Sequence, residues 1–68
     1  MKYEICFEVY NQYDVDELNK KFNFTISSIN ILATHINISI IAQDNINEII
    51  DNLRLLNGFK LRSKSYYK

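Results

Sequence analysis

The sequence predicts an α+β domain whose elements follow one another as strand, helix, strand, strand, helix, strand. Apolar residues alternate with polar ones in four segments and recur with helical spacing in two others. All six segments fit into 68 residues, which is a suitable length for one small domain. We therefore expect a single domain over residues 1–68.

The first strand is expected over residues 2–10, where a clean alternation indicates a half-buried strand. Asp14 is expected to be the N-cap of the first helix, with Glu17 at the capping-box spacing. The apolar stripe of that helix consists of Val15, Leu18 and Phe22.

The second strand is expected over residues 24–32, and the sequence leaves its register open. In a regular strand its apolar residues would fall on both faces, whereas a bulge at Ser27-Ser28 would return them to one face. The third strand, residues 36–42, is rich in isoleucine and fits a central position in the sheet.

The second helix is expected to begin after Asp44 or Asn45 and to end at Asn57-Gly58, where glycine permits a left-handed C-cap. Its apolar stripe consists of Ile46, Ile49, Ile50, Leu53 and Leu56. The last strand is expected over residues 59–67. Phe59 and Leu61 are expected to face the core, and Lys60, Arg62 and Lys64 are expected to face outward.

Two strand–helix–strand crossovers joined by a hairpin correspond to the ferredoxin-like βαββαβ arrangement. This predicts a four-stranded antiparallel sheet in the order 4-1-3-2, with both helices on one face. Right-handed crossovers further predict that the first and third strands are central, adjacent and parallel. The uncovered face is expected to carry Glu4, Cys6, Glu8, Tyr10, His35, Asn37, Ser39, Ile41, Lys60, Arg62, Lys64 and Tyr66.

Composition argues against several classes of partner. Eight basic and eight acidic residues cancel, so no net charge attracts nucleic acid or anionic lipid. No apolar run is long enough to span a bilayer, and the residues after Met1 alternate instead of forming a signal peptide. The single cysteine, Cys6, fits a reducing, cytoplasmic location. A core this small supplies only about 3–5 kcal/mol, so we expect a homodimer.

Three groups of residues suggest chemistry, and each has a simpler explanation. The basic stripe with nearby tyrosines could bind nucleic acid, but edge-strand cations that prevent aggregation explain it better. That stripe consists of Lys60, Arg62, Lys64 and Lys68, beside Tyr66 and Tyr67. One cysteine and one histidine, Cys6 and His35, are too few for a zinc site. The acidic residues at 14, 16 and 17 fit a helix N-terminus, so we expect no enzyme, metal or cofactor.

Two surfaces remain as candidate sites. The first is the loop that connects a central strand to a helix N-terminus, where free N–H groups can hold a carboxylate or amide. It consists of Asn11, Gln12, Tyr13 and Asp14. The second is an interface on the uncovered face of the sheet, for which we select Tyr10, Asn37, Ser39, Ile41, Arg62 and Tyr66.

Residues 45–61 resemble the ACT-type regulatory domains, in which an amphipathic helix likewise runs through leucine into glycine and a final strand. Members of that family pair through their sheets and bind amino acids near the first strand–helix loop, which corresponds here to residues 11–14. The resemblance implies the same topology and a regulatory role.

The sequence therefore favours a small non-enzymatic interaction or regulatory module, homodimeric through its open sheet face or an edge strand. Three alternatives stay open. They are an ACT-like sensor of a small ligand, an inhibitor from a virus or mobile element that binds a host enzyme, and a weak nucleic-acid binder.

Overall fold

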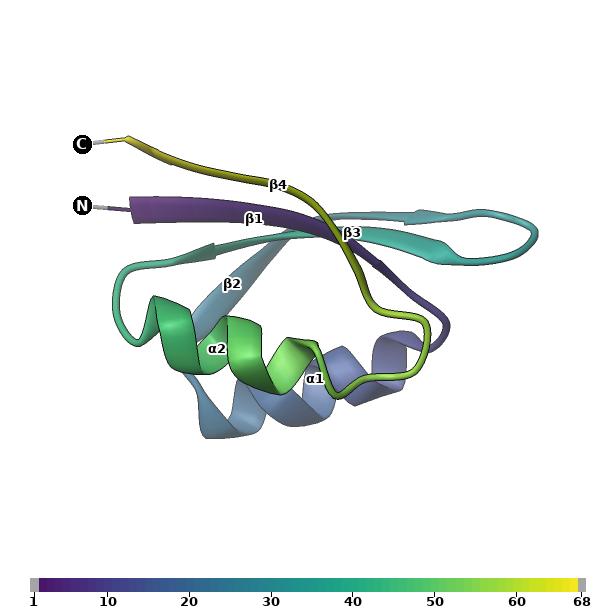
Figure 1. Cartoon of the computed structure of the whole chain (residues 1–68), viewed down its shortest axis with the longest axis horizontal. Coiled ribbons are helices and arrows are strands. Elements are labelled where there is room, and N and C mark those ends of the chain that lie inside the picture. Colours follow the sequence, from purple (N-terminus) through teal and green to yellow (C-terminus); the bar gives the residue numbers. More distant parts are fainter. Residues whose placement is uncertain (1, 68) are drawn as a thin grey trace.

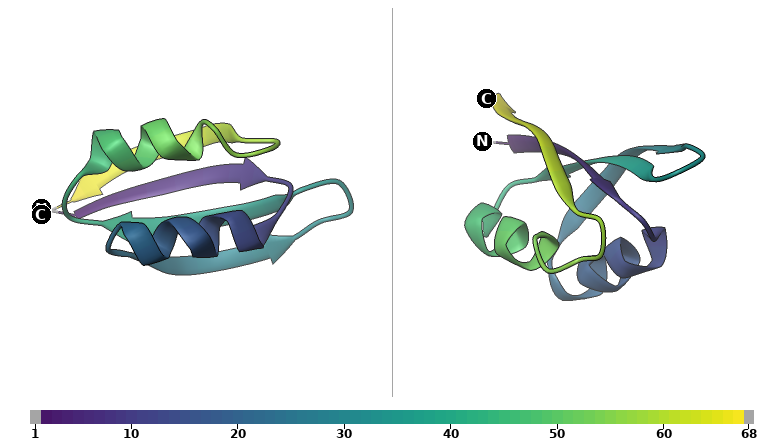
Figure 2. Two further views of the ribbon diagram at one scale, coloured as in Figure 1. Left: turned by 90° about the horizontal axis from the view of Figure 1, so that it is seen from below. Right: turned by 45° about the vertical axis from the view of Figure 1, so that its right-hand side comes forward.

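The computed structural model describes residues 2–67, without the side chain of Tyr67. The elements are β1 (Lys2–Val9), α1 (Gln12–Lys21), β2 (Phe24–Ile31), β3 (Ile36–Ala42), α2 (Ile46–Leu53) and β4 (Lys60–Tyr67). The strands form one sheet with both helices on the same face (Figure 1). Helix α1 lies over the β2–β3 side, and α2 lies over the β1–β4 side (Figure 2).

The strand order is β2-β3-β1-β4, which is 4-1-3-2 when listed from the opposite edge. All three neighbouring pairs are antiparallel. The prediction of a parallel first and third strand is therefore wrong. Each helical crossover joins two strands that are not neighbours and leaves room for one strand between them. The hairpin reverses the chain, so β3 enters the space beside β1 in the opposite direction.

A bulge interrupts β2 at the position that the sequence left open. The register of β2 on β3 shifts between Ile26 and Ser28, so that Ser27 is an extra residue. The Ser27 hydroxyl donates a hydrogen bond to the Ser39 carbonyl at 3.1 Å. The bulge places all apolar residues of β2 opposite the helix-facing residues of β3. These apolar residues are Phe24, Ile26, Ile29 and Ile31.

A second bulge, which the sequence did not predict, lies in β4. The register of β4 on β1 shifts by one position at Arg62. Because a one-residue shift reverses the alternation, Lys64 lies opposite the buried Ile5 and Tyr66 lies opposite Tyr3. The rings of this tyrosine pair are 5.6 Å apart. The expectation that Lys64 and Tyr66 lie on the open face is therefore wrong.

The first helix begins earlier than the sequence predicts. Asn11 is its N-cap, and the Asn11 side-chain oxygen accepts the N–H of Tyr13 at 2.9 Å. The predicted N-cap, Asp14, lies inside the helix, and Glu17 does not reach back to the cap. Its carboxylate instead accepts a hydrogen bond from Lys20 at 2.8 Å, which lowers the pKa of Glu17.

The second helix is shorter than expected. Asn45 is its N-cap, in a left-handed conformation with φ of 60° and no side-chain capping bond. The helix ends at Leu53, not at Asn57-Gly58 as predicted. The chain continues through turns that are closed by backbone hydrogen bonds. Gly58 has the expected left-handed backbone, with φ of 75°, but it lies in the loop before β4.

The core fills the space between the sheet and the two helices. Its largest fully buried side chain is that of Phe7, whose ring lies 5.7 Å from that of Phe59. Among the residues whose side chains are described, the buried set is Ile5, Phe7, Val9, Val15, Phe24, Ile38, Ile40, Ala42, Ile49, Ile50 and Leu53. Phe24 and Ala42 were not among the predicted core residues. Leu61 was, yet it is 38% exposed because β4 lies at the edge of the sheet.

Candidate functional site

The open face of the sheet is mostly polar. Residues that lie opposite one another across the four strands form rows on this face. The rows are Asn30, Asn37, Glu8 and Lys60; Ser28, Ser39, Cys6 and Ser63; and Thr25, Ile41, Glu4 and Ser65. No described helix covers these rows (Figure 1). A polar, solvated face of this kind is usual for an antiparallel sheet with helices on one side.

Glu8 is the centre of the only charged cluster that the described part of this face contains. Its carboxylate accepts a hydrogen bond from Arg62 at 2.7 Å and lies 3.8 Å from the Nε2 atom of His35. The His35 Nδ1 atom is 3.0 Å from the hydroxyl of Thr34. The Glu8 side chain is only 18% exposed. Arg62 is therefore held within the fold as a partner of Glu8.

The two side chains that could have formed a reactive pair do not meet. The Cys6 sulfur lies 3.1 Å from the hydroxyl of Ser39, whereas His35 is directed to Glu8 and Thr34. Among the described residues, no three His, Cys, Asp or Glu side chains gather closely enough to hold a metal ion. The Asn37 side-chain oxygen is buried in this region without a hydrogen-bond partner. Cys6 and His35 therefore do not form a nucleophile–base pair.

We expect Glu8 and Arg62 to be coupled in a double-mutant cycle with Glu8→Gln and Arg62→Ala. The coupling should be about 0.5–1 kcal/mol in urea unfolding, because the pair is partly shielded, and should shrink at high salt. A cycle on the exposed pair Glu17 and Lys20 is the control and should give a smaller value. If the two substitutions changed the free energy of unfolding additively, the contact between Glu8 and Arg62 would not contribute to stability.

The predicted ligand loop is occupied by its own helix cap. Asn11 directs its side-chain oxygen to the N–H of Tyr13, and this bond takes up one of the free donors at the helix N-terminus. Gln12 and Asp14 lie half-buried in the first turn, and the Tyr13 side chain is exposed. The four residues are adjacent, as predicted, but their polar groups stabilise the start of α1.

The structure brings together only part of the predicted interface. Asn37, Ser39, Ile41 and Arg62 lie on the open face, on β3 and β4. Two tyrosines lie elsewhere. Tyr66 is on the helix-covered face. Tyr10 follows β1, where its backbone N–H donates to the Asn57 carbonyl at 3.1 Å and its ring lies against Gly58.

The basic stripe is also divided. Lys60 lies on the open face opposite Glu8, Arg62 binds Glu8, and Lys64 turns to the helix side. Lys68 lies outside the described residues. The stripe therefore does not present one continuous positive row along the described part of β4.

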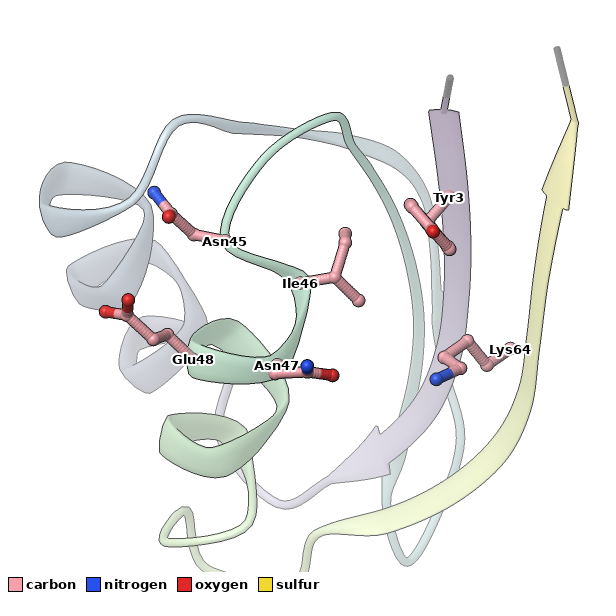
Figure 3. Close-up of a pocket in the computed structure, with 6 residues that line it drawn as sticks. All are labelled: Tyr3, Asn45, Ile46, Asn47, Glu48 and Lys64. Carbon is pink, nitrogen blue, oxygen red and sulfur yellow. The ribbon is translucent and has the colours of Figure 1, made fainter.

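The bulge in β4 creates a feature that the sequence did not suggest. An open depression lies between β1, β4 and the first turn of α2 (Figure 3). Lys64 points from β4 toward this turn, across the side of β1 that carries Tyr3. The depression is lined by Tyr3, Asn45, Ile46, Asn47, Glu48 and Lys64. Sequence reasoning missed it because it placed Lys64 on the opposite face.

The β2–β3 hairpin carries three neighbouring apolar side chains that are exposed. It extends beyond the ends of both helices (Figures 1 and 2), so its apolar side chains remain uncovered. Ile29 is 39% exposed, Ile31 is 71% exposed and Leu32 is 42% exposed. Residues 22–43 contain no Asp, Glu, Lys or Arg. This uncharged run was visible in the sequence and is the signal that could have identified the surface.

Comparison with protein-family models, curated proteins and solved structures finds no match to this chain. Within residues 2–67, no helix is long and apolar enough to cross a membrane.

Proposed function

We propose that the chain is a ferredoxin-like domain that acts as a non-enzymatic interaction module and associates with itself. The ferredoxin-like assignment is supported by the element order, the strand order and the position of both helices on one face. The observation that carries the functional proposal is the uncovered apolar surface of the β2–β3 hairpin at the edge of the sheet. Exposed apolar patches of this kind mark interaction sites.

Two routes to self-association follow from the fold, through the open face or through an edge strand. Stacking two open faces would remove Glu4, Glu8 and Lys60 from water, and burial of charges is costly unless each is paired and hydrogen-bonded. Burial of the hairpin surface removes apolar side chains from water and no charge. The edge route is therefore the favoured one.

We further propose that this self-association is regulatory and that the protein is cytoplasmic. Cys6 is a free thiol, as expected for a cytoplasmic protein. Sensing of a small ligand in the manner of ACT domains has weaker support, because the Asn11 side chain already accepts one of the free N–H groups at the N-terminus of α1.

Sedimentation equilibrium of the full chain tests the proposal. We expect the average mass to rise from that of a monomer to that of a dimer as the concentration increases from low to high micromolar. A small domain gains stability by mass action when it dimerises, so the thermal midpoint should rise in parallel. A monomer throughout this range would overturn the proposal.

A further inference from the structure

We propose that β2 pairs with β2 of a second copy in antiparallel orientation, about a two-fold axis that passes through Asn30. This pairing would join the two sheets into one continuous eight-stranded sheet with all four helices on one face. It rests on the proposed self-association and specifies the surface and the register that mediate it.

The distribution of charge decides which edge can pair with itself. A two-fold pair of β4 strands would bring two sets of Lys60, Arg62 and Lys64 to one seam, and like charges that meet across a strand pair are destabilising. Such cations are a common protection of edge strands. Strand β2 has no charged residue, because the whole run 22–43 lacks them. A second copy therefore meets no like charge at β2.

The hydrogen bonds of the hairpin show which backbone groups of β2 face outward. The Leu32 N–H donates to the His35 carbonyl across the hairpin at 2.9 Å. The backbone groups of successive residues in a strand point to alternate sides, so Asn30 also bonds toward β3. The N–H and C=O groups of Ile29 and Ile31 therefore point toward the free edge. The bulge at Ser27 ends this regular pattern.

These outward groups select the register. Residues directly opposite in an antiparallel pair share a face and, in hydrogen-bonded pairs, exchange both of their bonds. A two-fold axis at Asn30 places Ile29 of each copy opposite Ile31 of the other. The outward N–H and C=O groups of both residues would then all form hydrogen bonds between the copies. A shift to an axis at Ile29 would pair Ile31 with the bulged Ser27. The axis at Asn30 avoids the bulge.

The same register buries the exposed apolar side chains. Ile29 and Ile31 lie on the helix-side face, opposite Ile38 and Ile36 of β3. Two copies would bring four isoleucines together beneath the shared sheet, where they remove each other from water. Asn30 would meet Asn30 of the second copy on the open face, where both amides remain solvated.

Two substitutions at one position test the pairing by sedimentation equilibrium. Ile31→Lys should weaken dimerisation roughly hundredfold or more, because two lysines would face the apolar cluster. Ile31→Pro should abolish it, because proline removes an outward N–H that β3 does not use. Both variants should keep the circular dichroism spectrum of the monomer, since Ile31 is 71% exposed. The control is Leu55→Lys at an 81% exposed leucine outside β2, which should dimerise normally.

A cross-link tests the position of the axis. In a Cys6→Ser background, Asn30→Cys should form a covalent dimer with oxidised glutathione, because non-hydrogen-bonded cross-strand pairs have Cα atoms about 4.5 Å apart. Thr25→Cys in the same background is the control and should stay uncoupled.

The outcomes separate this inference from the proposed function. A wild-type monomer at all concentrations would overturn both. A dimer that persists in Ile31→Lys and Ile31→Pro would support self-association and overturn the β2 pairing. A dimer lost in those variants, and cross-linked through residue 30, would establish the pairing.

Discussion

Replacing Phe7 with alanine is expected to unfold the domain at 25 °C. Phe7 lies in the central strand β1 with 0% exposure, and its ring packs against that of Phe59. Removal of a buried phenylalanine side chain costs about 3–5 kcal/mol through lost apolar contact and the cavity left behind. A domain of this size has only about 3–5 kcal/mol to lose.

Urea unfolding followed by circular dichroism measures this effect. Phe7→Leu should remain folded and lose about 1–1.5 kcal/mol, since it keeps most of the side-chain volume. Leu55→Ala is the matched control, because Leu55 is 81% exposed and its loss should change stability by less than about 0.5 kcal/mol. A Phe7→Ala protein with a midpoint near that of the wild type would show that the core is not organised around this ring.

Sequence periodicity was sufficient for the elements but not for every register. The sequence indicated a possible bulge in β2, because a regular strand would place Ile29 and Ile31 on the face opposite to that of Phe24 and Ile26. From Arg62 to Ser65, β4 contains only arginine, lysine and serine, which are tolerated on either face of an edge strand. The two tyrosines that follow are consecutive, so the sequence is compatible with either alternation. The bulge at Arg62, and with it the position of Lys64, could therefore not be predicted.

The start of the first helix was predicted wrongly. The capping-box spacing to Glu17 favoured Asp14 as the N-cap, although Asn11 is an equally suitable residue type. The structure selects Asn11, whose side chain receives the Tyr13 N–H. The same bond weakens the prediction of a ligand loop, because Asn11, one of the residues expected to bind a ligand, caps the helix instead.

The uncovered hairpin follows from the lengths of the elements. The ten residues of α1 span about 15 Å as a helix, whereas the eight residues of β2 span about 26 Å as a strand. A helix of this length cannot cover the whole strand, so one end of the hairpin must extend past it. Periodicity indicates which face of a strand is apolar, but it does not indicate how far the covering helix reaches.

Replacing Gly58 with alanine is expected to be the most damaging single change outside the core. Gly58 has a φ of 75°, a conformation that costs a residue with a Cβ atom roughly 1–2 kcal/mol. An added Cβ would also lie 2.5–2.7 Å from three carbon atoms of the Tyr10 ring. Because the Tyr10 backbone is bonded to Asn57, the ring must move to make room. We expect a total loss of about 2–3 kcal/mol in urea unfolding.

The two causes can be separated with Tyr10→Ala. The double variant Gly58→Ala with Tyr10→Ala removes the steric overlap but keeps the backbone strain. Its additional destabilisation relative to Tyr10→Ala alone should therefore fall to about 1–2 kcal/mol. An equal cost of Gly58→Ala in both backgrounds would mean that the ring moves aside freely and that backbone strain accounts for the whole effect. A cost near zero in the wild-type background would contradict a left-handed turn at this position. The loop between α2 and β4 would then not depend on glycine.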